Sequence, residues 1–411
     1  MLGLSLLVNL GLLCYFKYLF FFADSIVSLF HIFNITITLP AINIILPLGI
    51  SFYTFQTISY TIDVYRGFIP PERDFVLYGC YVTFFPQLVA GPILRAGEMI
   101  HQFVNRPLFN LYDIGIGVRR ILYGLFLKVV LADNIAPLVD TGFAQPVNLM
   151  SALDVWTLAF LFGFQIYFDF SAYSHIAIGS ARLMGIRFPE NFNFPYMATS
   201  PRDFWQRWHI SLSSWVRDYI YLPLLGVPVH DRSVGGLPVD ENRQQKSQKG
   251  NIALFVTWAI MGLWHGASWG FVCWGIYHAI LIFLYRVTTP LFNNLSEGLR
   301  KIGGWMITFP LCMLGWIFFR AQNLSDAFAM YAKIVDPREY LSLGLRENYY
   351  LIAALVVMAV IACCYFKTSV IPIIRRQMLL ATVIETGVFA VIVGLVFVFL
   401  RPINQFIYFQ F

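Results

Sequence analysis

Charged residues are scarce in this sequence. Asp, Glu, Lys and Arg make up 12% of the 411 residues, whereas hydrophobic residues make up 58%, and the mean hydropathy is +0.68. A soluble domain has roughly 25% charged residues, so this chain has too few charges to cover a surface that faces water. We therefore predict an all-α polytopic membrane protein with roughly nine to eleven transmembrane helices.

Several signatures of soluble enzymes are also missing. The chain contains no GxSxG elbow, no P-loop and no GxGxxG turn, so nothing in it supports a serine hydrolase or a nucleotide-driven pump. Its six cysteines show neither CxxC nor Cys/His ligand spacing, which leaves no basis for a zinc site or a disulfide framework. We expect no metal and no cofactor.

The basic residues exceed the acidic ones, and the formal net charge is +6. Because no basic run is interleaved with aromatic residues that could stack on bases, nucleic acid is not expected as a partner. Lys and Arg beside spanning segments are instead expected to meet membrane lipid headgroups. Those that cluster between residues 202 and 249 place this region on the cytoplasmic side, by the positive-inside tendency.

Apolar runs long enough to cross a bilayer occur near residues 2–33, 41–62, 75–94, 113–132, 151–172, 251–270, 271–288, 303–319, 350–366 and 380–400. The first run is interrupted by Lys17 and is expected to form two segments. It has no basic n-region and no cleavage site, so it is a spanning segment rather than a removable signal peptide. We interpret residues 1–411 as one domain.

Two stretches break this pattern. Residues 173–226 are mixed and rich in aromatic residues, Arg and Pro, and no clean apolar span fits them. Irregular backbone at membrane depth must be satisfied by protein or by a watery cavity, so we predict re-entrant and interfacial helices around a central tunnel. Residues 227–250 are polar and rich in turn residues, and are expected to form a solvated loop.

Two histidines are the candidate catalytic residues. His265 lies well inside the apolar run 251–270, among the small residues Gly262, Gly266 and Ala267, which could admit another backbone or a slender substrate. Imidazole can take a proton from an attacking hydroxyl and return one to a leaving group near neutral pH. Burial disfavours the imidazolium cation and keeps the base form available. The alternative is a histidine that packs the helix and bonds to a backbone carbonyl.

The other polar residues in apolar surroundings have plausible structural roles. His209 is either a second catalytic histidine or an anchor at the membrane interface. His175 and His278 are expected to be packing residues. Asp169 could orient a histidine, pair with Arg, or cap a helix that begins after Phe170 and Ser171.

The surrounding motifs identify a family. RDFWQRWHISLSSWVRDYIYLPLLG (202–226) and GLWHGASWGFVCWGIYHA (262–279) closely resemble the membrane-bound O-acyltransferases, in particular the bacterial branch that acts in alginate O-acetylation. Matching stretches also occur at 47–67, 84–99, 167–196 and 315–327. The resemblance implies a funnel-shaped helical fold with a tunnel through the bilayer, and it implies a bacterial inner-membrane location.

The resemblance also implies site residues and partners. His265, in the WHG motif, corresponds to the catalytic histidine, and His209, in the RWH motif, to the second histidine position of this branch. The implied acyl donor is acetyl-CoA, and the acceptor is a polysaccharide or an SGNH-type periplasmic acetyltransferase. The residues expected to line the substrate tunnel are Trp264, Trp208, Asp169, His175, Arg207, Gly266 and Trp205.

The chain departs from the alginate-type pattern in three places. It reads SAYSHIAIG where those proteins read SGYSDMAIG, so His175 replaces an acid and Ala172 a glycine. The segment after LPLLG is also longer, and the abrupt start suggests that one or two N-terminal helices of the family are absent. Two alternatives to an enzyme are a membrane conduit and a scaffold of a polysaccharide export or synthesis complex. A conduit should have two related halves with interrupted helices and several intramembrane charges.

Overall fold

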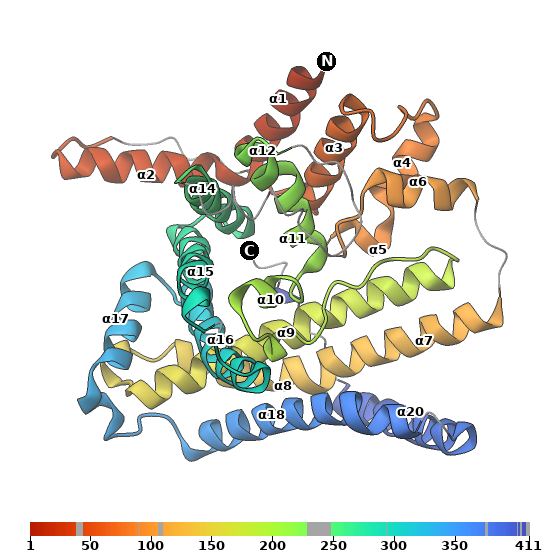
Figure 1. Ribbon diagram of the computed structural model, residues 1–411. Coiled ribbons are helices and arrows are strands. Elements are labelled where there is room, and N and C mark those ends of the chain that lie inside the picture. The colour runs from red at the N-terminus through yellow and green to blue at the C-terminus, as the bar shows by residue number, and fades with distance from the viewer. Residues whose placement is uncertain are drawn as a thin grey trace.

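A computed structural model describes the chain except for residues 38–43, 90, 106–109, 228–247, 293, 375–376, 401, 403–404 and 408–411. Within the described residues every regular element is a helix, and no strand is present (Figure 1). The predicted all-α class is therefore confirmed. Most of the polar stretch predicted as a loop at 227–250 falls outside the described residues.

Five helical stretches among the described residues are long and apolar enough to cross a membrane: Leu2–Ile32, Ala152–Leu183, Trp269–Phe292, Glu297–Arg320 and Leu379–Phe399. The polytopic membrane character predicted from composition is confirmed by these spans. Other predicted runs form shorter helices. The run at 75–94, for example, is divided into α4 (Phe75–Thr83) and α5 (Phe85–Leu88), with Pro86 in the first turn of α5, where its missing N–H is tolerated.

Burial separates a central helix from peripheral ones. Within its most apolar window, α9 (Ala152–Leu183) has 83% of its residues buried, against 11% for both Leu2–Ile32 and Leu379–Phe399. Helix α9 packs along α7 (Leu111–Leu125), and the two lie side by side in Figure 1. A helix that is apolar all round and covered by protein belongs to the core, whereas the peripheral helices present apolar residues to lipid.

The N-terminal run forms two segments, as predicted. Helices α1 (Leu2–Leu13) and α2 (Leu19–Ile32) are joined by a π-helical turn, Cys14–Tyr18, which contains Lys17, and the chain bends there (Figure 1). Such turns commonly kink a helix. The bend directs the Lys17 side chain toward the protein interior.

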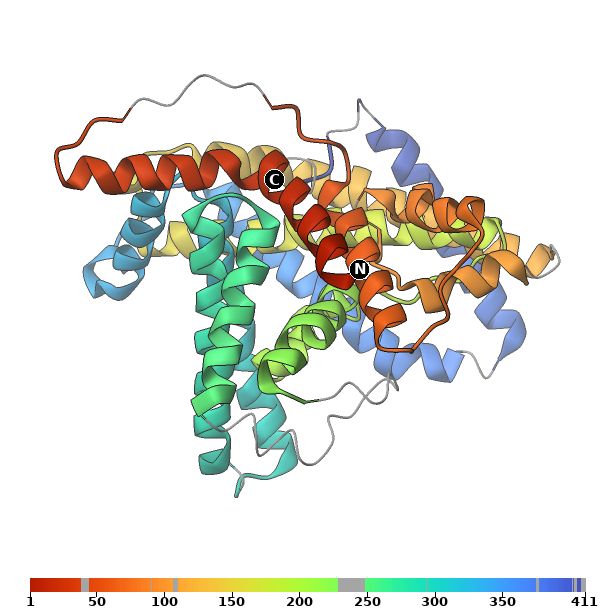
Figure 2. The same cartoon turned by 90° about the horizontal axis from the view of Figure 1, so that it is seen from above.

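The candidate histidines lie on a second group of helices. Helix α14 (Gln248–His265), α15 (Trp269–Thr288) and α16 (Glu297–Arg320) stand side by side in Figure 2. Short helices precede them: α10 (Pro201–Trp205), α11 (Ile210–Val216) and α12 (Leu222–Leu225). The predicted absence of a clean span is therefore correct from residue 184 onward, but α9 extends through 173–183, where Gly179 packs directly against α7.

The remaining α-helices are α3 (Ile50–Tyr65), α6 (Ala96–Val104), α8 (Asp133–Phe143), α17 (Leu324–Val335), α18 (Glu347–Tyr365), α19 (Ile371–Ile374) and α20 (Met378–Phe399). Helices α18 and α20 lie along the outer side of α7 and α9 in Figure 1. The largest hydrophobic core includes residues of α3, α9, α14 and α16 and surrounds both candidate histidines.

Candidate functional site

His265 is the last residue of α14, and its side chain faces the protein interior. The residue is 5% exposed, and its ring centroid lies 5.0 Å from that of Trp264, 4.9 Å from Trp274 and 5.4 Å from Phe319. His265 was predicted to lie well inside an apolar spanning segment, and this is wrong because α14 ends at His265. The chain turns at Gly266, whose carbonyl accepts from the Ser268 N–H at 2.9 Å, and α15 begins at Trp269.

Glycines make this turn possible. A Cβ on Gly262 would lie 2.2 Å from the carbonyl oxygen of Phe271, and one on Gly266 would lie 2.1 Å from the Phe271 ring. Both distances are far below van der Waals contact. The small residues around His265 therefore admit another part of the chain, as predicted, and that part is the first turn of α15.

Lys17 binds the C-terminal end of α14. Its Nζ donates to the carbonyl oxygen of Trp264 at 2.6 Å, to that of His265 at 3.4 Å and to Ser51 Oγ at 3.2 Å. The last carbonyls of a helix have no partner within the helix, and a cation is favourable at this negative end. Lys17 therefore fixes the position of the backbone that carries the His265 side chain.

His209 is held in an unusual backbone conformation. Its φ and ψ are 43° and 55°, in the left-handed region, at the N-terminus of α11. For a residue other than glycine this conformation costs about 1–2 kcal/mol. The side chain is fully buried, so the alternative of an interface anchor is wrong, and backbone outliers of this kind cluster at functional sites.

Hydrogen bonds orient the His209 ring. Nδ1 lies 3.3 Å from Asn191 Oδ1, and that oxygen also accepts from the Ser211 backbone N–H at 3.2 Å and from Ser211 Oγ at 2.9 Å. Because Asn191 Oδ1 is an acceptor, Nδ1 is the nitrogen that donates, and Nε2 keeps its lone pair. His209 is thus prepared to accept a proton or a hydrogen bond at Nε2.

Trp264 lies close to both histidines. Its ring centroid is 6.3 Å from that of His209 and 5.0 Å from that of His265. It stacks on Phe55 at 5.2 Å, which holds the indole in place. The structure therefore brings together three predicted site residues from two separate motifs, 202–226 and 262–279.

Around them is a group of large buried rings that we call the aromatic cluster: Trp205, Trp208, Trp264, Trp274, Trp316 and Phe319. Trp208 lies 4.9 Å from Trp316, and Trp274 lies 6.0 Å from Trp316 and 5.6 Å from Trp205, between ring centroids. The predicted tunnel residues Trp205 and Trp208 are thus core residues next to the histidines. An apolar wall of this kind excludes water from a reactive acyl group.

A cavity of about 850 Å³ lies beside the aromatic cluster. Phe319 lines it and also packs against His265, so a single ring separates the imidazole from the cavity. Asp140 also lines the cavity, and its side chain is 63% exposed, so the cavity reaches the protein surface. His265 is therefore neither turned to lipid nor remote from solvent.

Asp169 lines this cavity as part of a buried charged cluster. Lys128 Nζ lies 2.6 Å from Asp169 Oδ1 and 3.0 Å from Asp133 Oδ1, and all three side chains are at most 7% exposed. The Ile407 backbone N–H also donates to Asp169, at 2.7 Å. Asp169 thus pairs with a lysine, and the capping alternative is wrong because α9 continues past it to Leu183.

Two predicted tunnel residues lie apart from the aromatic cluster. The Nδ1 of His175 lies 2.8 Å from Nη1 of Arg120, and its ring meets that of Tyr123 edge to face at 4.8 Å, so its neighbours come from α7. Arg207 Nε donates to Asp203 Oδ1 at 2.6 Å. The structure gives both side chains local partners.

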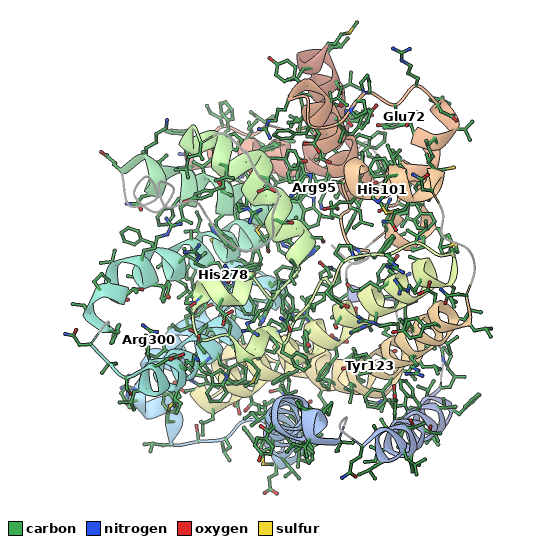
Figure 3. All side chains as sticks on the ribbon, turned by 45° about the vertical axis from the view of Figure 1, so that its right-hand side comes forward. Glu72, Arg95, His101, Tyr123, His278 and Arg300 are labelled. Carbon is green, nitrogen blue, oxygen red and sulfur yellow. The ribbon has the colours of Figure 1, made fainter. Side chains whose placement is uncertain are left out.

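His278 is a buried histidine beside the aromatic cluster whose unpartnered state the sequence reasoning missed. It was expected to pack with its polar atoms satisfied, but neither ring nitrogen has a hydrogen-bond partner among the described residues. It lies on α15 in the interior of the molecule (Figure 3), 5.0 Å from the ring of Trp274. The sequence separation of His265 and His278 does not reveal that they are close in space, because their proximity depends on how α14 and α15 pack together.

Comparison with known proteins identifies the family. Residues 72–235 match the membrane-bound O-acyltransferase family. The chain is 40% identical over 331 residues to the "Probable alginate O-acetylase" of Azotobacter vinelandii, covering 80% of this chain and 62% of that protein. It is 37% identical over 352 residues to the peptidoglycan O-acetyltransferase of Helicobacter pylori, covering 79% of this chain and 62% of that protein.

A more distant relative is the teichoic acid D-alanyltransferase of Streptococcus thermophilus, 29% identical over 66% of this chain and 68% of that protein. The chain spans about three fifths of the length of its alginate and peptidoglycan relatives. A match over 80% of the chain must include its middle, so His209 and His265 both lie within it. The predicted resemblance is confirmed: this integral membrane protein contains a domain of the membrane-bound O-acyltransferase family and is a relative of the alginate O-acetylases.

Proposed function

We propose that this chain is an O-acyltransferase that moves an acetyl group from acetyl-CoA to a hydroxyl of a cell-envelope or extracellular polysaccharide. The observation that carries the proposal is that two buried imidazoles, His209 and His265, both lie next to Trp264. Acyl transfer needs one group that removes a proton from the attacking hydroxyl and returns it to the leaving thiolate. His265 has the chemistry and the position for this role.

In this proposal His209 assists the reaction from a fixed orientation. Asn191 holds its Nδ1, so the ring cannot rotate freely and Nε2 remains the acceptor. Trp264 and Trp208 exclude water and thereby protect the thioester from hydrolysis. The cavity beside Phe319 would supply a route from the surface to the reacting group once the Phe319 ring moves aside.

The two substrates are expected to arrive from opposite sides of a bacterial cytoplasmic membrane. The basic residues between 202 and 249 favour the cytoplasm for that region, where acetyl-CoA is made. The cavity lies at the other ends of α14 and α16, near Ser268 and Arg320, on the side where an acceptor would be. The acceptor is either the polysaccharide itself or an SGNH-type partner transferase that passes the acetyl group on.

Release of CoA distinguishes an enzyme from a conduit. Purified protein in lipid vesicles is supplied with acetyl-CoA labelled in the acetyl group and with an acetylatable polysaccharide, with and without an SGNH-type partner. An acyltransferase releases one free CoA for each acetyl group transferred. A protein that only passes molecules across the membrane, or that only scaffolds a complex, would release none, and that result would refute the proposal.

Lys17 is expected to be a positioning residue for His265. In Lys17→Met the carbonyls of Trp264 and His265 lose a charged donor, and the end of α14 can shift. Because a displacement of about 1 Å can lower a rate roughly 100-fold, we expect kcat to fall about 10- to 100-fold with KM little changed. Lys17→Arg, which keeps a cationic donor, should retain more activity than Lys17→Met.

The matched control is Asp24→Asn, which removes an exposed charge from the same N-terminal stretch and should leave kcat unchanged. Steady-state kinetics of the four proteins in identical vesicles makes the comparison. If Lys17→Met and Asp24→Asn are equally active, Lys17 does not position the catalytic group.

A further inference from the structure

Several buried rings in or beside the aromatic cluster carry polar nitrogens without a partner among the described residues, and three of these rings lie together. Trp205 Nε1, Trp274 Nε1 and both ring nitrogens of His278 make no hydrogen bond within the described part of the chain. The residues are 7%, 0% and 1% exposed, so bulk water does not reach them. A buried N–H left unpaired costs about 1–3 kcal/mol, so each such group in a native protein calls for an explanation, such as a catalytic role or a bound water or ion.

The three rings converge on one region. The His278 ring centroid lies 5.0 Å from both Trp205 and Trp274, and these two indoles lie 5.6 Å apart. The contacts are edge to face, with interplanar angles of 69–89°. Edge-to-face contacts of this kind are a preferred geometry of aromatic pairs, so the three rings form one packed unit with their unpartnered nitrogens close together.

A glycine packs closely against His278. Gly315 of α16 faces its Nε2, and a Cβ there would lie only 3.0 Å from that nitrogen. Any larger residue at this position would cover the nitrogen. The rings are also close to the proposed base, since Trp274 lies 4.9 Å from His265, between ring centroids.

We propose that the indole N–H groups of Trp274 and Trp205 and the imidazole of His278 form a binding site for the carbonyl oxygen of the acyl thioester. Indole donates only, and neutral imidazole donates once and accepts once, so the set offers three donors and one acceptor. A carbonyl oxygen, which only accepts, is complementary to such a set. The inference rests on the proposed acyltransferase function. It adds to that function a binding site for the electrophilic carbonyl group of the thioester.

The site would act while charge develops on the acyl group. The acceptor hydroxyl oxygen bonds to the carbonyl carbon as His265 takes the hydroxyl proton, and the C=O π electrons move onto the oxygen. The N–H donors stabilise that oxyanion. When C=O reforms, the C–S bond breaks, the thiolate of CoA leaves with its electron pair, and His265 returns the proton to it. Donors placed before the reaction are worth more in a dry site than in water.

The test replaces one donor without changing the shape of the cluster much. Trp274→Phe keeps an aromatic ring and removes Nε1–H, and we expect kcat to fall about 100-fold or more with little change in KM, as for the loss of one oxyanion donor. A second pair of variants guards against misfolding: His278→Gln keeps a donor and should retain much of the activity, whereas His278→Leu should lose it. Rates are normalised to the folded fraction measured by thermal unfolding.

The matched control is Trp305→Phe, which removes an indole N–H that already has a partner, the Tyr196 carbonyl oxygen at 2.9 Å. It should alter stability but not kcat. If Trp274→Phe and His278→Leu both keep kcat within about threefold of the unaltered protein, the nitrogens bind only structural water and the inference is overturned. In that case the proposed function survives, provided that the unaltered protein releases CoA. A protein that releases none refutes the function itself.

Discussion

His265→Ala is expected to abolish detectable acetyl transfer, with a fall in rate of about 100- to 10,000-fold. General acid–base groups contribute factors of this size, and no other imidazole is as close to both Trp264 and Trp274 in the described residues. The protein should still be made and inserted, with some loss of stability because the buried ring also packs against Trp274 and Phe319. The measurement is acetylated polysaccharide and free CoA produced per folded molecule.

His101→Ala is the matched control for that variant. His101 is an exposed histidine of α6 whose Nδ1 bonds to the Gly97 carbonyl oxygen, and it lies away from His278 in Figure 3. Its removal should leave activity unchanged. Acetylation retained in His265→Ala at the level of His101→Ala would exclude His265 as the base.

Lys128→Met is expected to cause the largest loss of stability. The substitution leaves the carboxylates of Asp133 and Asp169 buried together without their cation, and removing one member of a buried ion pair costs about 3–5 kcal/mol. We expect a marked fall in the melting temperature in detergent. The double variant Lys128→Met/Asp169→Asn should recover part of that loss, because it removes one of the two stranded charges.

An exposed ion pair provides the comparison. Lys301 pairs with Glu297 at 2.6 Å, and their side chains are 63% and 70% exposed. Lys301→Met should cost no more than about 1 kcal/mol, as is usual for surface pairs. If Lys128→Met is no less stable than Lys301→Met, the buried charged cluster does not hold α9 to its neighbours in the way that the structure indicates.

The helices were largely predictable from the sequence because their cause is local. Apolar length places α9, α14, α15, α16 and α20 close to the predicted runs, and the N-terminal run was correctly divided at Lys17. The boundaries that were missed have tertiary causes. Helix α9 continues past residue 173 and packs there against α7 through Gly179, and α14 ends at His265, where α15 folds back against Gly262.

The candidate site was predictable only in part. The sequence singles out His209 and His265 because an ionisable residue in apolar surroundings needs a reason, and the family motifs agree. The left-handed backbone of His209, the contact from Lys17 and the unpartnered nitrogens of His278 depend on segments far apart in the chain. The hydrophobic pattern and the helix propensities of the sequence contain no information on such contacts.

The central claim is that the acyl group reacts inside the aromatic cluster, beside His265. The most direct measurement is an electron cryomicroscopy structure of the chain in lipid nanodiscs with a non-hydrolysable acetyl-CoA analogue. We predict that the acyl carbonyl lies within about 5 Å of the His265 imidazole, the distance that one intervening hydroxyl spans. An acyl group bound elsewhere, for example beside Lys128 in the cavity with Phe319 still sealing off His265, would contradict the account.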